Sequence, residues 1–260
     1  MNLNLNNKYA LVCGSTAGIG KATAIALAQE GAIVTLIARN ENKLKATLAA
    51  LPQHLKHDYM VADFSNPMEL KEIVEAYIKS NHGFHILVNN TGGPAGGPIF
   101  EAKVEEFENA FTQHLKCNHV LVQATAPFMK SEAYGRIINV ISTSVKQPLD
   151  GLGVSNTIRG AVANWSKTLA NELGPFGITV NNVLPGATAT ERLTEIIKNK
   201  SAKTGTTEEE SANAMKNAVP AKRFAQPSEL ADAITFLASE RAAYINGINL
   251  PVDGGRTKSL

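Results

Sequence analysis

Short apolar runs alternate with longer helical patterns along most of the chain. The apolar runs are too short for helices and are typical of buried strands; they are residues 9–13, 32–38, 57–62, 84–88, 136–141, 178–184 and 248–252. The helical patterns between them cover residues 21–30, 41–51, 67–80, 104–130, 154–173 and 227–239, and we expect a bend near Pro127. This alternation predicts an α/β fold: a doubly wound, mostly parallel seven-stranded sheet of Rossmann type, with helices on both faces.

The alternation is interrupted between residues 187 and 218. This segment is polar and charged, with a loop and the start of a helix at residues 204–210. We expect it to form a mobile, polar lid over a substrate site, because loops of this composition lie on the surface. No repeat, low-complexity tract or linker divides the sequence. Residues 1–260 are therefore expected to form a single domain.

Composition narrows the class of protein. The 260 residues are 44% hydrophobic and 18% charged, as in ordinary globular proteins, and the net charge of +2 gives no electrostatic case for binding nucleic acid or a membrane surface. The two cysteines, Cys13 and Cys117, imply no disulfide framework, and Cys13 is expected to be a small buried residue. The polar first residues do not resemble a signal peptide, and no apolar run has membrane-spanning length. We expect a soluble cytoplasmic protein.

A glycine-rich turn follows the first predicted strand and opens the first predicted helix. Gly14, Gly18 and Gly20 would let the backbone approach a phosphate, and the helix N-terminus would point N–H groups at it. By itself this spacing predicts either a pyrophosphate site or only a tight turn. In a doubly wound sheet ligands bind at the carboxyl ends of the strands, which would place the turn beside Asn89-Asn90 and Ser142.

The combination of motifs resembles the short-chain dehydrogenase/reductase family, and within it the β-ketoacyl-ACP-reductase-like members. The motifs that carry the resemblance are Gly14-x-x-x-Gly18-Ile-Gly20, Asp63, Asn89-Asn90-Thr-Gly92, Gly135-Arg-Ile-Ile-Asn-Val-Ile-Ser142, Leu184-Pro-Gly186 with Thr190, and Val252-Asp-Gly-Gly255. The resemblance implies NAD(P)(H) binding and hydride transfer at a carbonyl or alcohol carbon of a small molecule. It also implies a homotetramer packed through the two long helices, with a dimer as the alternative. We expect no metal site.

The resemblance also assigns a cofactor site. It implies that the pyrophosphate is held by Gly14, Ser15, Gly18, Ile19 and Gly20. It implies that Asp63 contacts the adenine and that Asn89 and Gly92 line the adenosine ribose. The carboxamide of the nicotinamide would be met by Pro185, Gly186 and Thr188. Asp63 has a second interpretation as a helix N-cap. No acidic residue ends the second strand, so Arg39 is expected to hold a 2′-phosphate, which favours NADPH over NADH. The alternative for Arg39 is a solvated surface charge.

The family's catalytic residues are where the sequence departs from the pattern. The family uses Asn, Ser, Tyr and Lys; counting from Ser142, these positions fall on His114, Ser142, Ser155 and Arg159. A serine hydroxyl is a far weaker acid than a phenol and is shorter. Arg159 keeps the positive charge and could bind the nicotinamide ribose, but an arginine stays charged and cannot donate a proton.

Two other residues could supply the proton. Lys146 lies on the loop after Ser142, and a desolvated lysine can act as an acid, although an exposed loop lysine is an equal alternative. Among these residues only His114 titrates near neutrality without perturbation, although a histidine on a long helix is more often a packed residue. Ser142 would bind a substrate oxygen or only cap the strand end.

Three functions remain open on this basis. The first is an NADP-preferring oxidoreductase with a non-standard proton relay. The second is a catalytically silent dinucleotide-binding protein that acts as a redox sensor or assembly partner. The third is an enzyme that uses the cleft without net redox change, in which Arg159, Lys146 and His114 would suit an anionic substrate.

Overall fold

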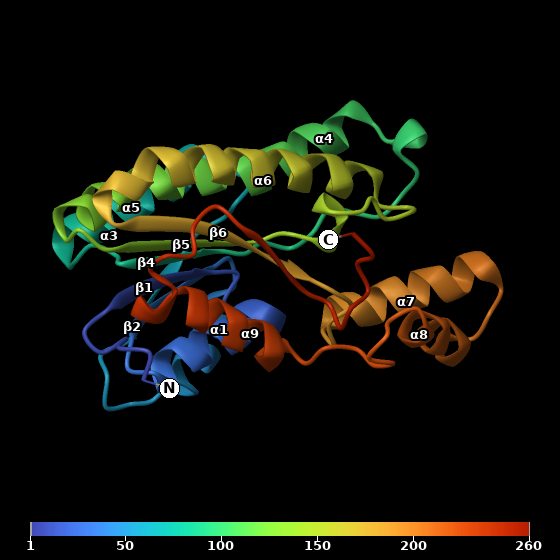
Figure 1. The fold of residues 1–260 in the computed structure, drawn as a ribbon, viewed down its shortest axis with the longest axis horizontal. Helices are drawn as coiled ribbons and strands as arrows, with labels where there is room; N and C mark the ends of the chain where they lie inside the picture. The colour runs from blue at the N-terminus through green and yellow to red at the C-terminus, as the bar shows by residue number, and fades with distance from the viewer. Residues whose placement is uncertain (1, 260) are drawn as a thin grey trace.

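The computed structural model describes residues 2–259 and contains a parallel sheet between two layers of helices (Figure 1). Seven strands are paired in the order β3-β2-β1-β4-β5-β6-β7, and every pairing is parallel. Their bounds are β1 Tyr9–Cys13, β2 Ile33–Ala38, β3 Asp58–Val61, β4 Ile86–Asn89, β5 Gly135–Val140, β6 Ile178–Pro185 and β7 Asn249–Val252. The predicted fold class is confirmed, and the strand order reverses between β1 and β4.

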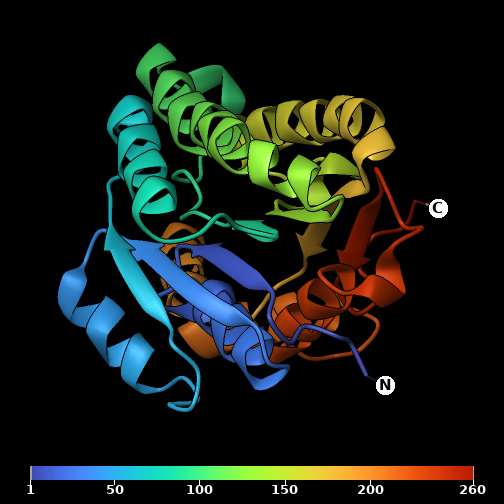
Figure 2. The same cartoon turned by 90° about the vertical axis from the view of Figure 1, so that its left-hand side faces the viewer.

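Helices bury both faces of the sheet, which explains why the strands read as continuous apolar runs. One face is covered by α1 (Gly18–Gln29), α2 (Glu41–Ala49) and α9 (Pro227–Leu237), and α1 packs on α9. The other face is covered by α3 (Pro67–Ser80), α5 (Cys117–Ser131) and α6 (Gly153–Leu173), as Figures 1 and 2 show. Between residues 2 and 259, no helix is both long and apolar enough to cross a membrane.

The helix expected at residues 104–130 is interrupted well before Pro127. The structure has α4 at Val104–Phe111, a π-helical turn at Thr112–Lys116, and then α5, with Pro127 inside α5. A π-helical turn adds a residue to the helix, and such turns are frequent at functional sites. Here the turn carries His114.

The segment expected to be irregular is mostly helical. It contains α7 (Glu191–Thr204) and α8 (Glu208–Asn217), which lie beyond the carboxyl ends of the strands (Figure 1). Thr190 caps α7 by accepting a hydrogen bond from the Leu193 N–H, and Thr207 forms a capping box with Glu210 at the start of α8. Most residues of these helices are polar and few are buried, so the apolar stripe that identifies a helix in the sequence is short.

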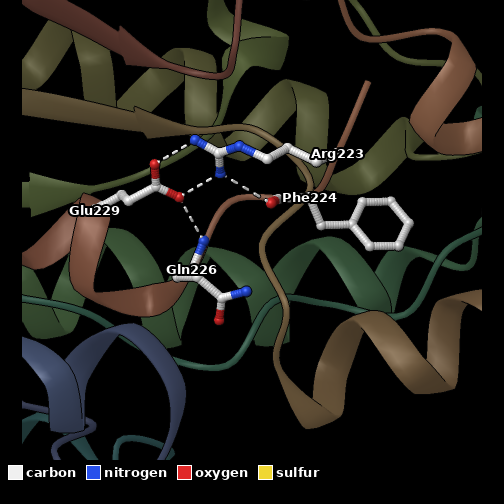
Figure 3. A network of polar contacts seen from close by, with 4 residues as sticks. All are labelled: Arg223, Phe224, Gln226 and Glu229. Atoms are coloured by element: carbon white, nitrogen blue, oxygen red, sulfur yellow. Dashed lines mark hydrogen bonds and ion pairs between the residues drawn. The ribbon is translucent and has the colours of Figure 1, made fainter. Parts of the chain in front are cut away.

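The two ends of this α7–α8 segment are held together at its base. The Ala225 N–H donates to the Ala187 carbonyl at 2.9 Å, and the Ala189 N–H donates to the Ala225 carbonyl at 2.8 Å. Beside them, Figure 3 shows Arg223 donating two hydrogen bonds of 2.6 Å to the carboxylate of Glu229. These bonds, with one from the Gln226 N–H, lower the pKa of Glu229 to about 2.

A row of asparagine side chains crosses four strands of the sheet. Asn89 donates to Asn139 at 2.8 Å, Asn139 to Asn182 at 3.1 Å, and Asn182 to Asn249 at 2.8 Å. These residues occupy directly paired positions on β4, β5, β6 and β7. We refer to Asn89, Asn139, Asn182 and Asn249 as the amide ladder. It places a row of polar groups, paired with one another, inside a largely apolar sheet.

Candidate active site

The glycine turn lies at the carboxyl end of β1, where the strand order reverses. Gly14 has φ +58°, and a Cβ atom there would lie 2.6 Å from the backbone oxygen of Asn90. A Cβ on Gly20 would collide with the backbone oxygen of Gly14. The Asn90 side chain donates to the carbonyl groups of Cys13 and Gly14, at 3.3 and 3.4 Å. The turn is therefore braced against the end of β4.

The start of α1 fits a pyrophosphate. The N-cap residue is Ala17, whose side chain cannot accept a hydrogen bond. The first N–H groups of the helix are therefore not occupied by the cap side chain and can bind an anion. The Oγ atom of Ser15 is buried and has no hydrogen-bond partner among residues 2–259. Ile19 packs against the core beneath the turn. These features suit the diphosphate of a dinucleotide.

The residues assigned to the adenosine end lie at the ends of β3, β2 and β4, on either side of β1. Arg39 is exposed directly after β2, and Asp63 is exposed after β3, where it accepts from the Ser65 N–H at 2.9 Å. The N-cap of α3 is Asn66, so the alternative role of Asp63 as a helix cap is wrong. The Asn89 side chain lies inside the sheet in the amide ladder, whereas Gly92 is exposed.

The residues assigned to the nicotinamide end form the turn after β6. The Gly186 N–H donates to the Val252 carbonyl at 3.0 Å, and Thr188 donates back to the Gly186 carbonyl at 3.1 Å. Pro185 ends the strand. A Cβ on Gly18 would lie 3.0 Å from the methyl carbon of Thr190, so the start of α7 lies against the glycine turn. The first and sixth strand ends thus border one site.

Ser142, Ser155 and Lys146 lie around the end of β5. Ser142 is half-buried two residues after the strand, and its Oγ accepts from the Ser144 N–H at 3.1 Å. It therefore does cap the chain after the strand, while its hydroxyl hydrogen is still available to donate. Ser155 is half-buried in the first turn of α6, and Lys146 is half-buried on the loop between β5 and α6.

Arg159 lies one helical turn after Ser155 and is buried. Its Nη1 donates to the Val140 carbonyl at the end of β5 at 3.1 Å, and its Nε has no partner among the described residues. Burial lowers the pKa of the guanidinium to about 10, so the group remains protonated at neutral pH. The structure thus places a positive charge at the carboxyl end of β5.

His114 lies beside Arg159 and is neutral. The residue is 1% exposed, and its Nδ1 lies 2.6 Å from Oγ1 of Thr91. Burial, and then the charge of Arg159, lower the pKa of His114 to about 2. The expectation that His114 titrates near neutrality is therefore wrong, and the ring is not a proton source. Nothing in the sequence pattern indicated its bond to Thr91.

Comparison with known proteins defines the class of this protein. A family model described as "Enoyl-(Acyl carrier protein) reductase" matches residues 14–257. The 3-oxoacyl-[acyl-carrier-protein] reductase FabG of Vibrio cholerae is 34% identical over 255 residues, which cover 97% of this chain and 98% of that protein. The chain belongs to the short-chain dehydrogenase/reductase family.

Solved structures agree with this assignment. The L-sorbose reductase of Gluconobacter frateurii, complexed with NADPH and L-sorbose, is 32% identical with a TM-score of 0.94, over 100% of both chains. A single-residue variant of actinorhodin polyketide ketoreductase, with NADPH, is 30% identical with a TM-score of 0.89, over 96% of this chain and 97% of that one. The protein is an NAD(P)-dependent oxidoreductase of the short-chain, ketoreductase-like type.

Proposed function

We propose that the protein is an NADP(H)-preferring oxidoreductase that reduces the carbonyl group of a small molecule, or oxidises the corresponding alcohol, without the tyrosine and lysine of its family. The observation that carries the cofactor assignment is the glycine turn, where the Ser15 hydroxyl has no partner within residues 2–259 and the N-cap Ala17 gives α1 no side-chain hydrogen bond. The preference for NADP(H) is supported by Arg39 at the end of β2, in a position to bind a 2′-phosphate. Two similar solved structures contain NADPH.

The catalytic residues in this proposal are Ser142, Ser155, Arg159, Lys146 and His114. When bound, the reduced nicotinamide supplies the hydride. Ser142 donates a hydrogen bond to the substrate oxygen, and Arg159 binds the nicotinamide ribose with part of its N–H donors. Ser155 is smaller than the tyrosine of the family and leaves room at that position. Neutral His114 orients the Thr91 hydroxyl beside Arg159. Lys146 or a chain of water molecules delivers the proton.

The α7–α8 segment forms the substrate lid in this proposal. Its start lies against the glycine turn, and its base is held together by the backbone bonds of Ala225. Arg192 on α7 donates to the Pro94 carbonyl at 2.8 Å, so the segment also reaches the loop after β4. Pro94 and the glycines of that loop border the same end of the sheet as Ser142.

We further propose that the protein is a homotetramer. Exposed apolar side chains support this: Phe100 is 98% exposed, and Val104 at the start of α4 is 68% exposed. Both lie where the first of the two long helices begins. Light scattering on the purified protein should give the mass of four chains, and the mass of one chain contradicts the proposal.

Cofactor titration followed by a turnover screen tests the function. NADPH should bind to the purified protein, and ketones or β-ketoacyl thioesters should then oxidise it. Ser142→Ala should lower kcat/KM by about 100-fold, the usual effect of losing a hydrogen bond to a developing oxyanion, with NADPH affinity unchanged. Absence of NADPH and NADH binding contradicts the proposal. Binding without turnover, unaffected by Ser142→Ala or Lys146→Ala, favours a dinucleotide sensor instead.

A further inference from the structure

The guanidinium of Arg159 is a buried cation that forms no ion pair with the residues that the structure describes. The residue is 8% exposed, and burial is the only cause of its lowered pKa, so no described carboxylate offsets its charge. The bond to Val140 uses one of its five N–H donors, and the Nε donor has no described partner. A buried charge without a counter-ion destabilises the folded protein, because the charge has lost its hydration. A negative group that binds there would remove this penalty.

The neighbouring His114 also has an unused polar atom. Its Nε2 is buried and without a partner among residues 2–259, while Nδ1 lies 2.6 Å from the Thr91 hydroxyl. When Thr91 donates to Nδ1, the proton of the neutral ring lies on Nε2, which becomes a free donor. Arg159 and His114 then present two unused donors, and the field of Arg159 is strong enough to contribute to the lowered pKa of His114.

The loop that faces this pair has almost no side chains. A Cβ atom on Gly93 would lie 3.9 Å from Nη2 of Arg159, which is the one atom found within 4 Å of that position in residues 2–259. The corresponding positions on Gly92 and Gly97 are open. The guanidinium therefore adjoins space that a ligand at the carboxyl edge of the sheet can occupy, next to the loop that Arg192 contacts.

We propose that Arg159 and His114 form a binding site for an anionic oxygen of the substrate. The chemical class is a carbonyl compound with a carboxylate next to its carbonyl group, or one bound as an enolate. A planar guanidinium binds such oxygen atoms with two parallel hydrogen bonds, which are stronger than bonds between neutral groups. The inference rests on the proposed function only in that the substrate is a carbonyl compound.

Calorimetry with matched probes tests the site in the protein with and without NADPH. Phenylglyoxylate, which has a carboxylate beside a ketone, should bind at least about tenfold more tightly than its uncharged methyl ester, the effect expected of a charge-assisted hydrogen bond. Arg159→Gln should reduce phenylglyoxylate binding to the level of the ester, and Arg159→Lys should retain part of it. Arg241→Gln, which removes an exposed arginine that contacts Asn2 and has no part in the site, is the control and should change little.

The wild-type comparison does not depend on whether a variant folds. Equal binding of phenylglyoxylate and its ester, together with no stabilisation of bound 4-nitrophenolate in its absorption spectrum, overturns the proposal. Stabilised 4-nitrophenolate without phenylglyoxylate binding supports the site and identifies the enolate as its ligand. NADPH affinity is measured in the same samples. Loss of NADPH binding therefore contradicts the proposed function, while anion binding to the protein alone reports on this site.

Discussion

At the scale of single residues, the sequence indicated where His114 lies but not its protonation state. The count along the chain indicated that His114 belongs near Ser142 and Arg159, and the structure places it beside Arg159. Its protonation state could not be predicted, because that depends on burial, on the charge of Arg159 and on the Thr91 hydroxyl, which are brought together only by folding. Sequence reasoning similarly did not find that Asn90 braces the glycine turn.

The low pKa of His114 predicts a pH-dependent stability. The folded-state pKa is about 2, against 6.5 for an ordinary histidine, so the unfolded chain takes up the proton first as pH falls. Below pH of about 6.5 the free energy of unfolding should therefore decrease, by about 1.4 kcal/mol per pH unit from this residue. His114→Asn should flatten that slope in urea unfolding at a series of pH values between about 6.5 and 4.

His54→Asn is the matched control, because His54 lies on an exposed loop. It separates the effect of the buried ring from that of losing one histidine. His85, whose pKa is lowered to about 4, mainly by burial, adds a slope of the same sign in both variants. An unchanged slope in His114→Asn contradicts the assignment of a neutral, buried ring.

The Arg39 assignment predicts a change in cofactor preference. Arg39→Ala should weaken NADPH binding by about 10- to 100-fold, because charge-assisted hydrogen bonds to a 2′-phosphate are lost, and should leave NADH binding unchanged. Fluorescence titration with both cofactors measures this. Lys43→Ala, in the first turn of α2, is the control. Equal weakening of NADPH and NADH binding contradicts the assignment, because it would show that Arg39 contacts a part of the cofactor other than the 2′-phosphate.

At the scale of elements, apolar periodicity located the helices that pack on the sheet and failed elsewhere. It predicted α6 within one residue at its start because one face of that helix is buried. It could not show the π-helical turn, because the apolar pattern of a helix continues before and after one inserted residue. It also missed α7, whose buried residues are Leu193 and Ser201. The local cap residues Thr190 and Thr207 were the better signal for α7 and α8.

The two threonine caps predict separable effects on the proposed lid. Thr190→Ala should destabilise the first turn of α7 by about 1 kcal/mol, because the Leu193 N–H loses its side-chain acceptor. Hydrogen exchange measured by mass spectrometry should then be faster at the start of α7 and unchanged in α8. Thr207→Ala should give the opposite pattern, since it removes the side-chain acceptor of the Glu210 N–H. A change in both helices from either variant contradicts independent capping.

At the scale of the whole molecule, the sequence was sufficient for the architecture. Alternating buried runs and helices predicted the doubly wound sheet, and the change in strand order between β1 and β4 then put the glycine turn next to the end of β4. The side-chain pairing across the sheet could not be predicted. The partners of each asparagine of the amide ladder lie on other strands, and the sequence does not show which side chains face one another across them.

The amide ladder predicts that its asparagines contribute unequally to the free energy of unfolding. Asn139→Ala removes the partner of Asn89, Asn182 and Ser166 at once. Each buried group left unpaired costs about 1–3 kcal/mol, so this variant should lose about 3 kcal/mol or more in urea unfolding. Asn249→Ala on the edge strand leaves only one amide of Asn182 unpaired and should lose about 1 kcal/mol. Equal losses contradict the ladder as a stabilising unit.

The amide ladder has a further consequence for how the strands find their alignment. A strand buried on both faces has no apolar and polar sides, so a slip against its neighbour leaves the burial of its side chains nearly unchanged. With asparagines opposite one another on β4, β5, β6 and β7, a one-residue slip of β4 against β5 would oppose Asn89 with Ile138 or Val140 instead of Asn139. The ladder thereby favours the alignment in which all four asparagines are paired, and in that alignment the ends of β4, β5 and β6 reach the cleft at fixed relative heights.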